Sequence, residues 1–141
     1  MVIRVEEFEK TYRETVAVQG LSFEVPAGSI VGLVGPNGAG KTTTLRALAG
    51  IIPPTRGRLT VAGHDIVADP IAAKSRLAFI PDDPQLFDVL TVREHLAFTA
   101  SVYQVPKFEA TGERLLTQFE LMERRDSLAL RQPSGGPRRP F

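Results

Sequence analysis

Residues 35–43 read Gly35-Pro36-Asn37-Gly38-Ala39-Gly40-Lys41-Thr42-Thr43, which is a G-x-x-x-x-G-K-[ST] spacing followed by one more threonine. The stretch follows the apolar run 30–34 and precedes a helical stripe formed by Leu45, Leu48, Ala49 and Ile52. The alternative is a glycine-rich turn with a surface lysine, but the order of strand, loop and helix favours a phosphate-binding P-loop.

The residue types in this loop suit a triphosphate. The glycines reach unusual backbone angles without strain, so that several amide N–H groups aim inward beside the positive end of the following helix. We expect Lys41 to reach the β- and γ-phosphates and Thr42 to complete the coordination of Mg²⁺. Thr43 is expected to contact the α-phosphate.

Composition sets modest limits on the 141-residue chain. It is 43% hydrophobic and 23% charged, which suits one soluble domain. With 17 basic and 16 acidic side chains, the net charge of +1 gives no electrostatic reason to expect nucleic acid as a partner. The absence of cysteine excludes disulfides, and no apolar stretch approaches the roughly 20 residues that span a bilayer.

Periodicity predicts an α/β chain. Residues 2–8 and 21–25 alternate apolar and polar positions, as an antiparallel flap would. The continuous apolar run 30–34 predicts a strand buried on both faces, and 58–61 and 77–80 are further expected strands. The fold class predicted is a P-loop NTPase-type core with this N-terminal antiparallel β flap, incomplete at the C-terminus.

The second half of the chain is predicted to be a helical subdomain. Thr91 followed by Glu94 forms a capping box for a helix that extends to about Tyr103. The stretch 109–122 is also amphipathic. By contrast, the tail 133–141 holds three prolines, two glycines and two arginines, and we expect it to be irregular.

The order of these motifs resembles the nucleotide-binding subunit of ATP-binding-cassette (ABC) transporters. Besides the P-loop, the resemblance rests on Tyr12 ahead of the segment 18–23, on the segment Ile80-Pro81-Asp82-Asp83-Pro84 followed by Leu90-Thr91-Val92-Arg93-Glu94, and on Ser134-Gly135-Gly136. It implies a partial nucleotide-binding domain over residues 1–132 and a tail over 133–141 with a remnant of the signature motif.

The resemblance implies ATP and Mg²⁺ as ligands. Tyr12 would stack on adenine, although an aromatic residue on the flap surface is the plain alternative. Ser134, Gly135 and Gly136 would face the ATP of a second nucleotide-binding subunit. Transmembrane permease subunits would then hold the protein at the cytoplasmic face of the membrane and choose the cargo.

The chain departs from the family at Asp82, where a glutamine is usual. A carboxylate could hold a metal-bound water, which makes Asp82 a candidate Mg²⁺ ligand. The segment Pro81-Asp82-Asp83-Pro84 resembles the form found in export-type cassettes, and this favours an exporter. Alternatively, Asp82 and Asp83 form a solvated turn, or they are the acidic pair of a different P-loop NTPase. Pro81 opposes this last interpretation because proline removes a ladder donor at the end of the strand.

The family's Walker B aspartate, catalytic glutamate and switch histidine have no counterpart after Gly136. We therefore name no catalytic residue, and ATPase activity stays uncertain. His64 and His95 lie far upstream and are expected to be ordinary histidines. The hypotheses left open are a truncated or frame-shifted product, an inactive nucleotide-binding subunit, and a DNA-repair or ribosome-associated cassette.

Overall fold

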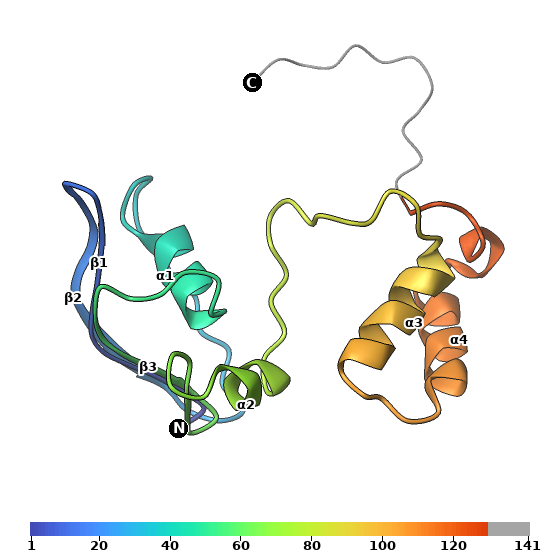
Figure 1. Ribbon diagram of the computed structural model, residues 1–141, viewed down its shortest axis with the longest axis horizontal. Helices are drawn as coiled ribbons and strands as arrows, with labels where there is room; N and C mark the ends of the chain where they lie inside the picture. The colour runs from blue at the N-terminus through green and yellow to red at the C-terminus, as the bar shows by residue number, and fades with distance from the viewer. Residues whose placement is uncertain (130–141) are drawn as a thin grey trace, which may run out of the picture. The chain divides into compact units, whose positions relative to one another are not determined.

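The computed structural model describes residues 1–129, which divide into two compact units after Ile80 (Figure 1). The tail predicted over 133–141, with Ser134, Gly135 and Gly136, lies outside the described residues. Among the helices of residues 1–129, none has the length and apolar character that crossing a membrane requires.

The first unit contains a four-stranded antiparallel sheet. Its strands are β1 (Ile3–Tyr12), β2 (Thr15–Val25), β3 (Arg56–Val61) and β4 (His64–Asp65), in the spatial order β2-β1-β3-β4. Strand β1 is central, because it pairs with β2 along one edge and with β3 along the other. The antiparallel flap predicted from the alternating residues is confirmed.

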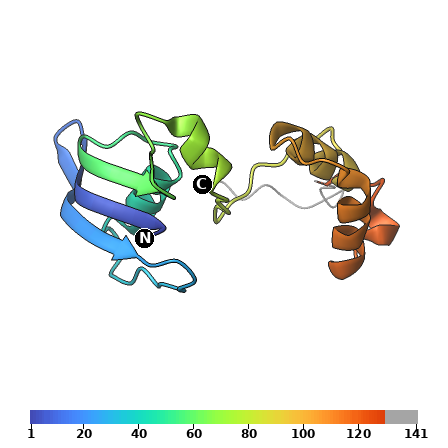
Figure 2. The ribbon, with the colours of Figure 1, turned by 90° about the horizontal axis from the view of Figure 1, so that it is seen from below.

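Helices α1 (Lys41–Leu48) and α2 (Pro70–Ser75) contribute further residues to the core of this unit. Helix α1 lies against one face of the sheet (Figure 2). Apolar residues of the sheet, the two helices and the chain after β4 form one buried cluster: Val5, Phe8, Ala47, Leu48, Leu59, Val61, Ile66 and Ala73. Burial of this cluster fixes α1, and with it the loop that precedes α1, relative to the sheet.

The strands predicted at 30–34 and 77–80 are wrong for the structure described here. Both segments are irregular, and Ile30, Val34 and Ile80 are almost completely exposed. A strand needs a neighbour for its backbone N–H and C=O groups. Within residues 1–129 no segment pairs with either of them. The apolar pattern identified residues suited to burial but not a partner that would bury them.

The second unit is helical, as predicted. It contains α3 (Val92–Val102), α4 (Phe108–Gln118) and the short 3-10 helix η1 (Met122–Arg124). Helices α3 and α4 lie side by side in both ribbon views (Figures 1 and 2). Within α4, the Phe108 ring lies against Gly112, where an added Cβ would lie 2.8 Å from Phe108 Cζ.

The capping box at the start of α3 is confirmed. The Glu94 amide donates to Thr91 Oγ1 at 3.2 Å, and the Glu94 carboxylate accepts from the Thr91 amide at 2.8 Å. These backbone and hydroxyl bonds from Thr91 hold the pKa of Glu94 below its ordinary value. The pair satisfies two amide groups that the first turn of a helix leaves without partners.

Replacing Thr91 with alanine is therefore expected to destabilise the helical unit by about 1 kcal/mol. Thermal unfolding followed by circular dichroism would measure the loss. The matched control is Thr99→Ala on the same helix, because the Thr99 hydroxyl only donates back to the His95 carbonyl at 2.9 Å. Equal destabilisation by both variants would contradict a capping role for Thr91.

Candidate functional site

The predicted P-loop lies at the N-terminal end of α1. Gly38 and Gly40 adopt φ angles of 83° and 81°, in the left-handed region that favours glycine. The Ala39 amide donates to the Pro36 carbonyl at 3.2 Å, which closes a turn within the loop. The sequence thus places its glycines where the backbone needs them.

A hollow of about 260 Å³ opens beside this turn. Residues from the loop, from the first turn of α1 and from β2 line it: Ala17, Asn37, Gly38, Gly40, Lys41, Thr42 and Thr43. The structure therefore brings together six of the nine residues predicted over 35–43. Gly35, Pro36 and Ala39 belong to the same loop but do not line the hollow.

Lys41 folds back on the loop that precedes it. Its Nζ donates to the carbonyl oxygens of Gly35 and Pro36, each at 2.6 Å. Two strong charge-assisted bonds therefore tie the start of the loop to the start of α1. An anion in the hollow would offer the same ammonium a more strongly charged acceptor.

The flap strand β2 packs directly against the loop. A Cβ atom added at Gly40 would lie 2.6 Å from both the Ala17 carbonyl oxygen and Val18 Cγ2. Gly40 therefore serves two purposes, since it supplies the left-handed turn and allows close approach of β2. Sequence reasoning did not name Ala17 or Val18 as site residues, although Val18 begins the segment 18–23 on which the resemblance partly rests.

Tyr12 ends β1 and pairs with Thr15 at the tip of the β1–β2 hairpin. Tyr12 is 45% exposed, and Lys10 Nζ lies 5.0 Å from the ring centroid. Tyr12 is not part of the hollow lining. It does belong to the same hairpin as Ala17 and Val18, which touch the loop, so stacking by Tyr12 stays a prediction.

Asp82 lies in the second unit, in the irregular segment before α3, and is exposed. Its neighbour Asp83 accepts a hydrogen bond from Gln85 Nε2 at 2.9 Å. Among the described residues there is no group of three or more acidic or histidine side chains suited to a metal ion. Mg²⁺ binding by Asp82 and Thr42 therefore stays a prediction.

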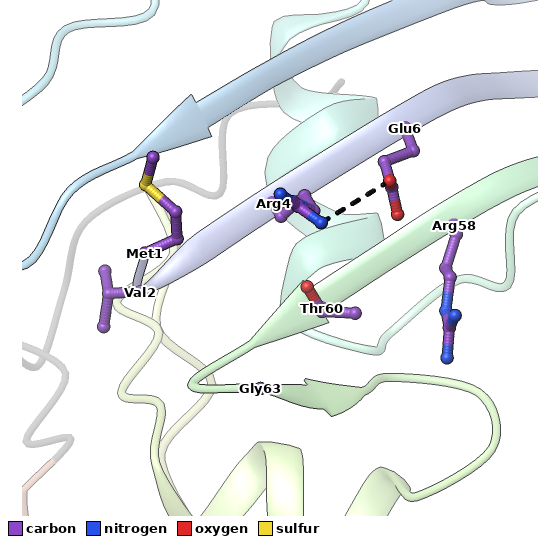
Figure 3. A pocket seen from close by; sticks show the side chains of 7 residues that line it. All are labelled: Met1, Val2, Arg4, Glu6, Arg58, Thr60 and Gly63. Carbon is purple, nitrogen blue, oxygen red and sulfur yellow. Dashed lines mark ion pairs between the residues drawn. The ribbon is translucent and has the colours of Figure 1, made fainter.

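Another hollow, of about 280 Å³, lies over β1 and β3 (Figure 3). Its charged residues already have partners within the protein. Arg4 lies 2.6 Å from the Glu24 carboxylate and 3.8 Å from that of Glu6, and Arg58 lies 2.8 Å from Asp65. Hydrogen bonds from the amides of Ala68 and Val67, together with Arg58, lower the pKa of Asp65. Because its charges are paired, this hollow is a weaker candidate than the one at the P-loop.

Comparison with known proteins points to one family. The family model described as "ABC transporter" matches residues 18–140. The chain is 41% identical to the SkfA peptide export ATP-binding protein SkfE of Bacillus subtilis over 106 residues, covering 75% of the chain and 44% of that protein. It is 37% identical to the Nod factor export ATP-binding protein I of Ralstonia nicotianae over 140 residues, covering 98% of the chain and 43% of that protein.

A solved structure described as the ATP-binding subunit of an ABC transporter also matches. The TM-score is 0.82 at 32% sequence identity, and the match covers 91% of the chain and 54% of that subunit. The chain thus spans about half the length of these relatives.

Proposed function

Because the chain belongs to the ABC transporter family of ATP-binding subunits, we propose that it binds ATP with Mg²⁺ as part of a membrane transporter. One observation supports this proposal above the others. The hollow at the start of α1 is lined by two left-handed glycines, Gly38 and Gly40, together with Lys41 and the threonines that follow it. Such an arrangement favours a phosphate chain.

Each residue has an expected part in this site. Backbone N–H groups of the loop after Pro36 would surround the β-phosphate, and Lys41 would exchange its two carbonyl acceptors for β- and γ-phosphate oxygens. Thr42 would bind Mg²⁺, with Asp82 near a metal-bound water, and Thr43 would contact the α-phosphate. Tyr12 would stack on the adenine.

The wider assembly follows from the family. We propose transmembrane permease subunits and a second nucleotide-binding subunit as partners, with Ser134, Gly135 and Gly136 facing the second subunit's ATP. This assembly would place the chain at the cytoplasmic face of a membrane. The names of two relatives refer to export, of a peptide and of a Nod factor, and this favours export as the direction.

Nucleotide binding does not require hydrolysis. Phosphoryl transfer depends on a positioned water and charge stabilisation at the γ-phosphate. The described residues supply Lys41 and Thr42 but bring no carboxylate to the P-loop hollow as a base. We therefore propose ATP binding, as part of a transporter, as the activity of this chain. The second candidate is a nucleotide-binding subunit that binds ATP but is catalytically inactive.

Calorimetric titration of the full chain with ATP tests the proposal. We expect saturable binding of one ATP that is tighter with Mg²⁺ than with EDTA, because the cation neutralises the phosphates that Thr42 faces. ADP should compete, while adenosine should compete poorly, since the proposed site is built around phosphates. A chain that unfolds cooperatively but binds no ATP in Mg²⁺ would refute the proposal.

A further inference from the structure

We propose that Lys10 is a positioning residue for nucleotide binding, which holds the Tyr12 ring with one face covered and the other free for a purine. This inference rests on the proposed function and deepens it. The main observation behind it is that the Lys10 ammonium lies 5.0 Å from the centroid of the Tyr12 ring. That distance lies within the range of cation–π attraction.

Local structure puts the two side chains on one face. Lys10 and Tyr12 are two residues apart on β1, and side chains at that spacing point to the same side of a strand. Lys10 is of intermediate burial and its bond to Pro53 is solvent-exposed, so the cation–π contact lies at the surface of the unit. Attraction at such a site is modest.

A second contact fixes the ammonium. Lys10 Nζ donates to the Pro53 carbonyl at 2.8 Å. The segment that carries Pro53 is itself bonded to β1, since the Thr55 amide donates to the Glu9 carbonyl at 2.9 Å and the Thr11 amide donates to Thr55 Oγ1 at 3.0 Å. The ammonium therefore lies between a fixed carbonyl and the ring, and it limits the rotamers open to Tyr12.

This arrangement benefits a stacked base in two ways. A ring that is already held loses less conformational entropy when a ligand stacks on it. The cation also draws π-electron density towards its own side, which makes the opposite face a better partner for an electron-rich purine. Tyr12 as a residue is 45% exposed even with the ammonium beside it.

Tyrosine fluorescence can test this directly. The chain has two tyrosines and no tryptophan, so in a Tyr103→Phe background Tyr12 is the one remaining fluorophore of this kind. We expect ATP to change its emission. In this background Lys10→Met, which keeps the aliphatic stem, should weaken ATP binding about two- to fivefold. Lys74→Met, at an exposed position on α2, is the charge-matched control and should have no effect.

Inorganic triphosphate separates positioning from simple charge attraction. Lys10→Met should leave its affinity unchanged, because it has no base to stack, and Lys10→Met should add no further loss of ATP affinity in a Tyr12→Leu variant. Two results would overturn the role of Lys10. One is that Lys10→Met weakens the binding of ATP and of triphosphate equally, and the other is that the losses of ATP affinity from Lys10→Met and Tyr12→Leu are additive. Unchanged ATP binding by Lys10→Met would overturn it as well. Failure of the unsubstituted chain to bind ATP would instead reject the proposed function, and the Lys10 role with it.

Discussion

Replacing Lys41 with alanine is expected to weaken ATP binding by about 10- to 100-fold, because hydrogen bonds to a charged group contribute roughly 1.5–3 kcal/mol. The substitution removes the ammonium that would contact the β- and γ-phosphates. It also removes both bonds, at 2.6 Å, to the Gly35 and Pro36 carbonyls, so the loop loses its internal tie. Calorimetric titration with Mg²⁺-ATP measures the effect.

Lys74→Ala is the control for Lys41→Ala, because it removes the same charge from an exposed position in the same unit. Its ATP affinity should equal that of the unsubstituted chain. Circular dichroism should show that both variants keep their helices. If Lys41→Ala binds ATP as tightly as Lys74→Ala, the hollow at the start of α1 is not the nucleotide site.

Local signals in the sequence predicted those parts of the fold that local interactions determine. The alternating residues of β1 and β2 predicted the hairpin, and Thr91 with Glu94 predicted the start of α3 through bonds only three residues apart. In the capping box the interacting groups are close in sequence, and in the hairpin the alternation of residues indicates which face is buried.

The segments 30–34 and 77–80 show where such reasoning fails. Their apolar residues satisfy the composition of a buried strand, yet strand formation depends on a distant partner that supplies backbone hydrogen bonds. No segment within residues 1–129 does so. Composition reports the tendency to be buried, whereas pairing is a property of the assembled sheet.

The candidate site shows the same division. The motif at 35–43 predicted a glycine-dependent loop ahead of a helix, but it could not indicate that Ala17 lines a hollow there or that Val18 leaves no room for a Cβ at Gly40. Small apolar residues on a strand carry no chemical signal. The sequence analysis did not name Lys10 either, but here a signal was present. Lys10 lies two residues before Tyr12, and this spacing places both side chains on one face of β1.

Gly40→Ala is expected to destabilise the first unit by about 3 kcal/mol and to abolish measurable ATP binding. Two costs combine, since a left-handed backbone disfavours alanine by roughly 1–2 kcal/mol and overpacking adds about 1–3 kcal/mol. The overpacking arises because the new Cβ would lie 2.6 Å from the Ala17 carbonyl oxygen and from Val18 Cγ2. Either β2 or the loop must move, and both line the hollow.

Gly38→Ala isolates the contact with β2 from the backbone cost. Gly38 has nearly the same φ, 83° against 81°, but a Cβ there would meet nothing within 4 Å. It should therefore lose only about 1 kcal/mol, the cost of the left-handed backbone, and keep more of its ATP affinity. Urea unfolding followed by circular dichroism gives both free energies. If Gly40→Ala and Gly38→Ala lose the same unfolding free energy and the same ATP affinity, β2 can move away from the new Cβ at little cost. Packing of β2 against the loop would then not determine the shape of the nucleotide site.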